Sequence, residues 1–213
     1  MTQFVFREQT FHLHPYKAIF WQEQSALLIA DVHLGKVAHF RKSGIAVPRA
    51  AGQENWDKLL SLLMEYQPKK VWFLGDLFHS EYNDVWEELT TLIQQFSAVE
   101  FTLIKGNHDI LSVEQYEAAN LKVVDEIKQS RLLLTHHPLE EIPDGYYNLA
   151  GHLHPGVVLR GSGRQRMRLP CFYFGAQQAI LPAFGSFTGM MTMQPKRGDQ
   201  VFIVSDEQVV EVS

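Results

Sequence analysis

Three short runs of almost purely apolar residues, separated by segments with helical periodicity, constrain the fold of this chain most strongly. The runs are ALLIA at 26–30, VWFL at 71–74 and FTLI at 101–104. Strands without polar alternation are typical of a parallel sheet that is covered on both faces. The segments between the runs, 48–66 and 84–96, carry apolar residues at helical spacing. The order strand, helix, strand, helix, strand predicts a mostly parallel sheet with right-handed crossovers.

The residues after His108 follow a different pattern, with one short helix expected at 113–119 and then mostly strands. The expected strands of this half are 121–124, 131–135, 147–151, 156–159, 171–175, 201–205 and 208–212, and those before the first helix are 4–6, 11–14, 17–21 and 25–30. No linker, repeat or low-complexity tract interrupts the chain. We therefore expect one domain over residues 1–213, with an α/β fold in which two mixed β-sheets pack face to face and helices flank them.

The composition narrows the class of protein. A formal net charge of −5 gives no general support for nucleic-acid binding, so a local basic patch would have to supply it. Cys171 is the only cysteine, which rules out an intrachain disulfide framework and suits a reducing, cytoplasmic location. The first twenty residues contain charges and no long apolar core, so we expect no signal peptide. No run approaches ~20 apolar residues, so no membrane helix is expected.

Polar residues of similar chemistry follow five of the apolar strands. These residues are Asp31 with His33, Asp76, Asn107 with His108 and Asp109, His136 with His137, and His152 with His154. In open α/β sheets, ligands bind at the carboxyl ends of the strands. A tight turn would account for Gly106 and Asn107 alone, but five such strand ends are hard to explain by folding needs. We therefore expect these side chains to form one site.

The residue types at these strand ends indicate metal binding. Residues two apart point the same way from an extended backbone, so Asp31-x-His33 and His152-x-His154 can each present two ligands to one place. Carboxylates and neutral imidazoles suit divalent transition metals such as Mn, Fe, Ni or Zn. The candidate ligands are Asp31, His33, Asp76, Asn107, His136, His152 and His154, which are too many for one ion. If Asp76 bridges, two metals have about four ligands each, an arrangement that recurs in phosphoester hydrolysis.

Taken in order, these blocks resemble the signature of the calcineurin-like metallophosphoesterases. The matching blocks are Asp31-Val32-His33, Gly75-Asp76, Gly106-Asn107-His108-Asp109, His136 and Gly151-His152-Leu153-His154. The family fold is a four-layer α/β/β/α arrangement of two packed sheets flanked by helices. By position match, the resemblance implies one metal on Asp31, His33, Asp76 and His154, and a second on Asp76, Asn107, His136 and His152.

The same resemblance implies the chemistry. A solvent hydroxide between the metals would attack phosphorus, and His108 would stabilise the transition state or protonate the leaving oxygen. Asp109 would orient His108. His136 is preferred to His137 as the ligand, because the family's ligand follows its strand directly.

Departures from the family pattern limit the branches of the family that the chain can resemble. The chain reads GDLFHS and KGNHD where the protein Ser/Thr phosphatases read GDxVDRG and RGNHE. Neither the 26 residues between Asp109 and His136 nor the 15 between His136 and His152 can house a cap domain, which leaves the site open to a long substrate. Residues 30–48 and 74–80 resemble a bacterial branch encoded beside a DNA ligase, an exonuclease and a helicase, the ligase-associated DNA damage response endonucleases. That resemblance implies a manganese-dependent phosphodiesterase that cuts single-stranded DNA in repair, in functional association with those enzymes.

Basic residues near the motifs are candidates for substrate contacts. They are Lys36, Arg41 and His79 near the first two blocks, and Arg160, Arg164 and Arg166 after the last one. Lys and Arg contacts to phosphates give affinity that is independent of base sequence and falls with salt. The alternative for residues 160–168 is a solvated hairpin between two strands.

Two other functions stay open at this stage. A phosphodiesterase for small nucleotides or cyclic nucleotides is favoured by the net acidity, while the absence of a cap and the basic loops favour a polymer. A binding module that kept the fold without turnover is disfavoured by the full ligand set together with His108.

Overall fold

A computed structural model of the chain describes residues 1–37, 40, 44, 50–78, 84–186 and 188–212. The helices are the 3-10 helix η1 (Gln22–Gln24) and the α-helices α2 (Ala50–Tyr66), α3 (Asp84–Gln95) and α4 (Val113–Ala118). The strands of the first half are β1 (Thr2–Phe6), β2 (Gln9–His14), β3 (Ala18–Trp21), β4 (Ala26–Ile29), β5 (Lys70–Leu74), β6 (Glu100–Ile104) and β7 (Leu121–Val124). Those of the second half are β8 (Ile127–Gln129), β9 (Leu132–Thr135), β10 (Tyr147–Ala150), β11 (Pro155–Arg160), β12 (Arg166–Phe174), β13 (Gln178–Ile180), β14 (Met191–Thr192), β15 (Gln200–Val204) and β16 (Val209–Glu211).

The first sheet contains β1 to β7 in chain order. Strands β1 to β4 are antiparallel neighbours, whereas β4, β5, β6 and β7 run parallel. Each parallel step is connected through a helix, α2, α3 or α4. The sequence pattern predicted the steps through α2 and α3. The strand at 121–124 was expected among the strands of the second half, but as β7 it joins the first sheet beside β6. The carboxyl ends of these parallel strands therefore meet at one edge of the sheet.

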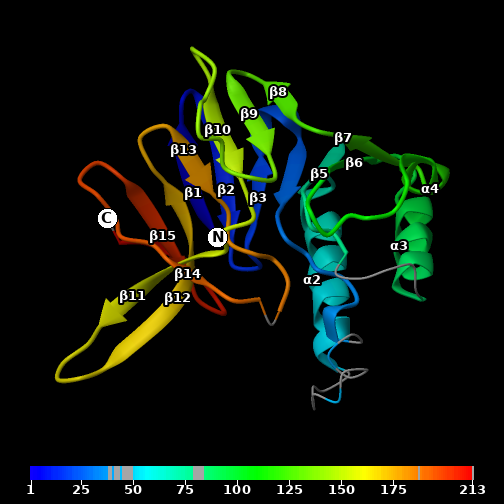
Figure 1. The fold of residues 1–213 in the computed structure, drawn as a ribbon. Helices are drawn as coiled ribbons and strands as arrows, with labels where there is room; N and C mark the ends of the chain where they lie inside the picture. The colour runs from blue at the N-terminus through cyan, green and yellow to red at the C-terminus, as the bar shows by residue number, and fades with distance from the viewer. Residues whose placement is uncertain (38–39, 41–43, 45–49, 79–83, 187, 213) are drawn as a thin grey trace.

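The second sheet is mixed and has the order β14-β11-β12-β13-β10-β9-β8, with β15 beside β12 and β16 beside β15. Strands β8, β13 and β14 were not predicted, because two or three residues are too short to show a period. Strand β12 begins at Arg166, before the predicted start at Cys171. Its first half forms a long hairpin with β11 that projects from the body of the molecule (Figure 1).

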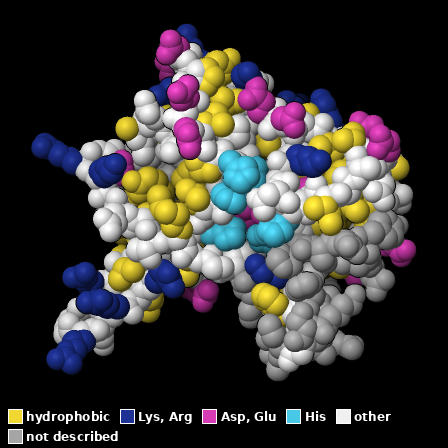
Figure 2. Space-filling view, in the orientation of Figure 1, with side chains coloured by type: hydrophobic (Ala, Val, Ile, Leu, Met, Phe, Trp, Pro, Cys, Tyr) yellow, Lys and Arg dark blue, Asp and Glu magenta, His cyan; other side chains and the backbone are white. Residues whose placement is uncertain are grey.

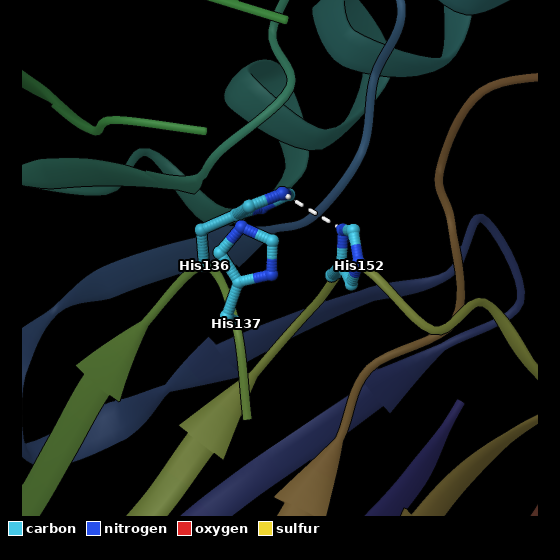
Figure 3. Close-up of side chains that lie close together, drawn as sticks. All are labelled: His136, His137 and His152. Atoms are coloured by element: carbon cyan, nitrogen blue, oxygen red, sulfur yellow. Dashed lines mark hydrogen bonds between the residues drawn. The ribbon is translucent and has the colours of Figure 1, made fainter. Parts of the chain in front are cut away.

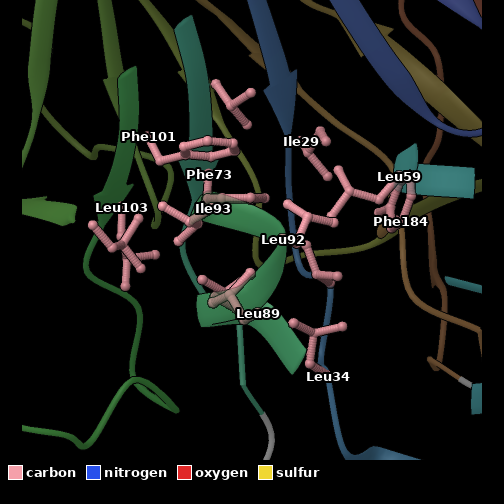
Figure 4. Close-up of a cluster of buried hydrophobic side chains, with 14 of the residues drawn as sticks. Ile29, Leu34, Leu59, Phe73, Leu89, Leu92, Ile93, Phe101, Leu103 and Phe184 are labelled. Atoms are coloured by element: carbon pink, nitrogen blue, oxygen red, sulfur yellow. The ribbon is translucent and has the colours of Figure 1, made fainter. Parts of the chain in front are cut away.

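Two hydrophobic cores hold the layers together. One lies between the helices and the first sheet, where Leu59, Leu92 and Ile93 pack with Phe73 and Phe101 (Figure 4). The other lies between the two sheets and includes Trp72, Leu74, Phe172 and Phe202 among its members. Neighbouring residues of β5 thus face different cores, which explains why the strand has no polar alternation.

The α-helices α2, α3 and α4 lie on the outer side of the first sheet (Figure 1). The two mixed sheets of the expected fold are confirmed, but a second helical layer is not found in the described part of the chain. The outer face of the second sheet instead has a small apolar cluster of Val157, Cys171 and Val201. No described helix is long and apolar enough to cross a membrane.

The segments between the later motifs are short. Residues 110–135 contain α4 and three short strands, and residues 138–146 form a loop without a strand or an α-helix. As predicted, neither segment forms a cap domain over the strand ends.

Candidate metal centre

Five of the seven predicted metal ligands have a left-handed backbone. The φ angles of Asp31, His33, Asp76, His152 and His154 lie between 49° and 67°. Such a conformation costs a residue other than glycine on the order of 1–3 kcal/mol and is concentrated at functional sites. The extended backbone assumed for Asp31-x-His33 and His152-x-His154 is therefore wrong. Each pair converges because the chain bends sharply at both of its members.

A first cluster contains Asp31, His33 and His154, whose candidate ligand atoms lie within 4.8 Å of one another. Asp31 and His33 are buried, and His154 is partly buried. The His154 Nδ1 atom lies 3.1 Å from the Gly189 carbonyl oxygen, so Nδ1–H donates there and the lone pair of Nε2 faces the cluster. Nε2 lies 3.5 Å from Asp31 Oδ1.

A second cluster contains His136, His137 and His152, again within 4.8 Å (Figure 3). His136 Nδ1 lies 2.9 Å from the Leu74 carbonyl oxygen, so it donates there and leaves the lone pair on Nε2. That Nε2 atom lies 3.1 Å from Asn107 Oδ1 and 3.2 Å from His152 Nδ1. The structure therefore brings together the three predicted ligands that are specific to the second metal.

The Asp76 carboxylate lies between the two clusters. Its Oδ1 is 3.4 Å from His136 Nε2, and its Oδ2 is 4.0 Å from His33 Nε2. Asp31, Asp76 and His136 also form a third group with candidate ligand atoms within 4.8 Å. This position is the one expected of a carboxylate that bridges two ions.

The donor set fits divalent cations. Asp31 Oδ1 is fully buried and accepts no hydrogen bond from the described residues. The lone pair of His154 Nε2 faces this oxygen, and the lone pair of His136 Nε2 faces Asp76 Oδ1. In both places, two hydrogen-bond acceptors therefore face each other. A cation between such atoms would offset the desolvation and the repulsion. The ligands are oxygen and imidazole nitrogen, which suits divalent transition metals.

Glycines precede three of the ligand positions, Asp76, Asn107 and His152, because backbone and side chains approach too closely there for a Cβ atom. A Cβ on Gly75, whose φ is +77°, would lie 2.1 Å from His136 Nδ1. A Cβ on Gly106 would lie 2.4 Å from both the backbone nitrogen and Oδ1 of Asp76. The glycines of the GD and GNHD blocks thus let three strand ends converge.

Asp109 is bonded to backbone amides rather than to the ring it was expected to orient. Its Oδ2 accepts from the N–H of Asp76 at 2.8 Å and of Gly106 at 2.9 Å. Its Oδ1 accepts from Leu77 at 2.9 Å and Phe78 at 3.3 Å. Burial raises the pKa of Asp109, an effect that these amides partly offset. These contacts indicate that Asp109 maintains the conformation of the Asp76 loop.

His108 lies at the open side of the cluster. Its backbone N–H donates to Asp76 Oδ1 at 2.9 Å, and its Nε2 lies 4.0 Å from Asp76 Oδ2. The side chain is 43% exposed, so it can meet a substrate that enters from solvent. This placement is compatible with the expected acid or transition-state contact.

The surroundings of two histidines of the second cluster favour the neutral form of their rings. The pKa of His152 is lowered first by burial and then by His137 and His136. The pKa of His137 is also lowered, mainly by burial. Neutral imidazole is the form that binds metals. Sequence reasoning preferred His136 to His137 as the ligand, and the only signal for His137 was its place beside His136 in THHP.

The predicted substrate residues fall into three groups. Lys36 is half-buried, and burial lowers its pKa, an effect that the charges of Asp76 and Asp31 partly offset. Arg41 and His79 lie outside the described residues. Arg160, Arg164 and Arg166 lie on the projecting β11–β12 hairpin, away from the histidines that gather on one face of the molecule (Figure 2).

A comparison with protein families matches residues 25–173 to the calcineurin-like phosphoesterase model. The match covers more than half of the chain, and the chain belongs to this family. Among solved structures, the Pseudomonas putida nuclease MPE is similar over 99% of both chains, with 29% sequence identity and a TM-score of 0.81. The E. coli phosphoesterase Yfce is similar at 13% identity and a TM-score of 0.44, over 88% of this chain and 97% of that one. A comparison with curated proteins finds no match.

Proposed function

We propose that this protein is a two-metal, manganese-dependent phosphodiesterase that acts as an endonuclease on single-stranded DNA in DNA repair. The observation that carries the proposal is the position of Asp76 between two clusters of ligand atoms, Asp31–His33–His154 and His136–His152 with Asn107. Two ions held in this way are the recurring apparatus of phosphoester hydrolysis.

The ligands divide into two sets that share one carboxylate. Asp31, His33 and His154 would hold one ion, Asn107, His136 and His152 would hold the other, and Asp76 would contact both. When bound, the ions lower the pKa of a water and neutralise charge on the phosphate. His108, exposed beside Asp76, would protonate the leaving oxygen. Lys36, whose ammonium feels the charges of Asp76 and Asp31, would contact a phosphate oxygen.

Support for a nucleic-acid substrate comes from the similarity to a nuclease over the whole length of both chains. The absence of a cap between Asp109 and His152 agrees with a polymer, because a strand can cross an open site. Functional association with a DNA ligase, an exonuclease and a helicase remains part of the proposal and rests on the sequence resemblance.

The test uses metal-stripped protein supplied with Mn²⁺ and circular single-stranded DNA, which has no ends. Cutting of the circle by the wild type, and not by Asp76→Ala, is the expected result. A chromogenic phosphodiester is assayed beside it. Hydrolysis of that diester with an intact circle would favour the alternative function, a phosphodiesterase for small nucleotides or cyclic nucleotides, which the net charge of −5 also favours.

A further inference from the structure

The acidic residues of the chain are distributed unevenly. All 24 Asp and Glu residues lie outside the segment 145–198, which contains Arg160, Arg164, Arg166, Arg168, Lys196 and Arg197. Four of these cations lie on the β11–β12 hairpin, which we call the basic hairpin (residues 155–174). A chain with net charge −5 therefore presents one locally positive arm.

The register of the basic hairpin places its arginines on one face. Arg160 pairs directly with Arg166, and Val158 pairs with Arg168. Since residues opposite and residues two apart share a face of a two-stranded ribbon, Arg160, Arg166 and Arg168 point the same way. Arg164 lies in the turn that joins the strands.

This arrangement is unfavourable by itself. Like charges directly opposite each other destabilise an antiparallel pair. Every residue from 160 to 168 is exposed, and no ion pair is found for these arginines among the described residues. A bound polyanion would relieve the repulsion between Arg160 and Arg166.

The basic hairpin begins at the candidate metal centre. Strand β11 starts at Pro155, directly after the candidate ligand His154. The 189–191 segment is bonded to both, because Gly189 accepts from His154 Nδ1 at 3.1 Å and Met190 accepts from Arg168 Nη1 at 3.2 Å. Lys and Arg side chains gather on the projecting hairpin on the same face of the molecule as the histidines (Figure 2).

We infer that the basic hairpin is a phosphate-binding arm that holds a single DNA strand several nucleotides away from the bond that is cut. This inference rests on the proposed function and adds where the strand runs. Five residue steps from Pro155 to Arg160 span about 17 Å at strand geometry. That distance corresponds to about five nucleotides at the ~3.4 Å spacing of stacked nucleotides.

A single strand fits better than a duplex. Asp31 and His136 are buried, whereas the arginines of the basic hairpin are exposed. The phosphate to be cut therefore has to lie deeper in the molecule than the phosphates that contact the hairpin. A flexible strand can enter the site while its neighbouring phosphates stay on the hairpin. A duplex would have to be bent or opened at an energetic cost.

The test measures binding of metal-free protein to a fluorescent 20-nucleotide oligothymidine at several salt concentrations. The double variant Arg160→Gln/Arg166→Gln removes two contacts, so the slope of log K against log[salt] is expected to fall by about 1.4, and affinity at 0.1 M salt by ~25-fold. The matched control is Lys69→Gln/Lys122→Gln, which makes the same charge change on exposed residues beside the amino end of β5 and in β7. It should bind like the wild type. Unfolding temperatures verify that both variants fold.

A second measurement compares the turnover of a long substrate with that of a short one. With Mn²⁺, the loss of kcat/KM caused by the double variant should be much larger for the 20-mer than for a chromogenic diester, which is too short to reach the arm. Equal losses on both substrates, a salt slope equal to that of the control, or a stronger effect on duplex than on single strand would overturn the inference. If the double variant loses DNA affinity but circular DNA stays intact, the proposed endonuclease activity is contradicted and the phosphate-binding role of the basic hairpin is supported. If circles are cut but the double variant binds DNA like the control, the endonuclease activity is supported and the role of the hairpin is contradicted.

Discussion

The Asp109 carboxylate lies 2.8 Å from the backbone nitrogen of Asp76 and accepts its N–H, which ties the third sequence motif to the second. Because Asp109 also accepts from Leu77 and Phe78, three consecutive amides of the Asp76 loop point at one buried carboxylate. The left-handed φ of Asp76 is thereby held in place. Asp109 thus positions a candidate bridging ligand, although it touches neither cluster as a ligand itself.

We predict that Asp109→Asn destabilises the metal-free protein by ~1–3 kcal/mol, because the amide NH₂ would face backbone N–H donors and leave them unsatisfied. Loss of a partner that orients a ligand should also weaken metal affinity by about 10–100-fold. Urea unfolding and metal titration measure the two effects, with exposed Asp125→Asn as the control for the charge change. Unchanged stability together with an altered kcat–pH profile would instead support an orienting role toward His108.

A second prediction concerns the shared carboxylate. Asp76→Ala should lower the content of both metals, because Asp76 reaches His136 on one side and His33 on the other. The loss of affinity should exceed the roughly 10–100-fold that an outer partner costs. Metal analysis after gel filtration measures it. His154→Ala, which changes one cluster, should retain more metal than Asp76→Ala, and two ions retained in Asp76→Ala would contradict the bridging assignment.

A third prediction separates chemistry from metal binding. His108→Ala should keep the wild-type metal content, because the ring is exposed at the mouth of the cluster, while turnover falls by ~10²–10⁴-fold. Single-turnover cleavage with saturating Mn²⁺ measures the chemical step. His12, which lies on β2 of the first sheet and is bonded to Gln22, provides a matched His→Ala control. A large loss of metal from His108→Ala would show that it acts as a ligand.

The adjacent histidines of the fourth block give a fourth prediction. His136 is buried and its Nδ1 is bonded to Leu74, which aims Nε2 at Asn107, whereas His137 is exposed at the rim of the same cluster. His136→Ala should therefore lose metal from the second position, and His137→Ala should lose much less. Comparing their metal titrations measures the difference. Equal losses would make His137 a further ligand, and a loss confined to His137→Ala would reverse the assignment.

The sequence predicted the parallel strands β4, β5 and β6 and the strand ends that meet beside them, because continuous apolar runs and the polar residues after them are local signals. It grouped the strand at 121–124 with the second half of the chain, whereas this strand, β7, lies parallel to β6 in the first sheet. It could not predict that Asp31, His33, Asp76, His152 and His154 are left-handed, since that conformation is stabilised by hydrogen bonds between distant segments. One such bond runs from the backbone N–H of His152 to Asp31 Oδ2 at 2.8 Å.

Short or exposed elements were also beyond the reach of sequence patterns. Strand β13 has three residues, and the first half of β12 alternates Arg with Met and Leu without a buried face, so neither shows a period that propensity can detect. The amide contacts of Asp109 depend on the fold of the Asp76 loop, and nothing local in GNHD distinguishes them from an orienting contact to the neighbouring His108.

A fifth prediction concerns His14, which lies outside the candidate metal centre. Its Nδ1 accepts the N–H of Tyr16 at 3.0 Å, so a protonated ring would lose this bond. Burial lowers the pKa of His14, and nearby Glu65 only partly offsets this effect. Since the unfolded histidine has a pKa of about 6.5, the unfolded state binds more protons below that pH. The contribution of His14 is therefore fully present above about pH 6.5 and is lost as the pH falls toward the lowered folded value.

The variant His14→Asn keeps an acceptor for Tyr16 N–H but does not titrate. Between pH 7.5 and 5, the unfolding temperature of the metal-free wild type should therefore fall more steeply than that of His14→Asn, by about 2–4 °C for each kcal/mol lost in a chain of this size. Because the other histidines titrate equally in both proteins, their effect cancels in the difference between the two curves. Parallel curves would show that the burial of His14 has no influence on stability, and a steeper fall for His14→Asn would mean that the ion pair with Glu65, 3.4 Å away, outweighs burial.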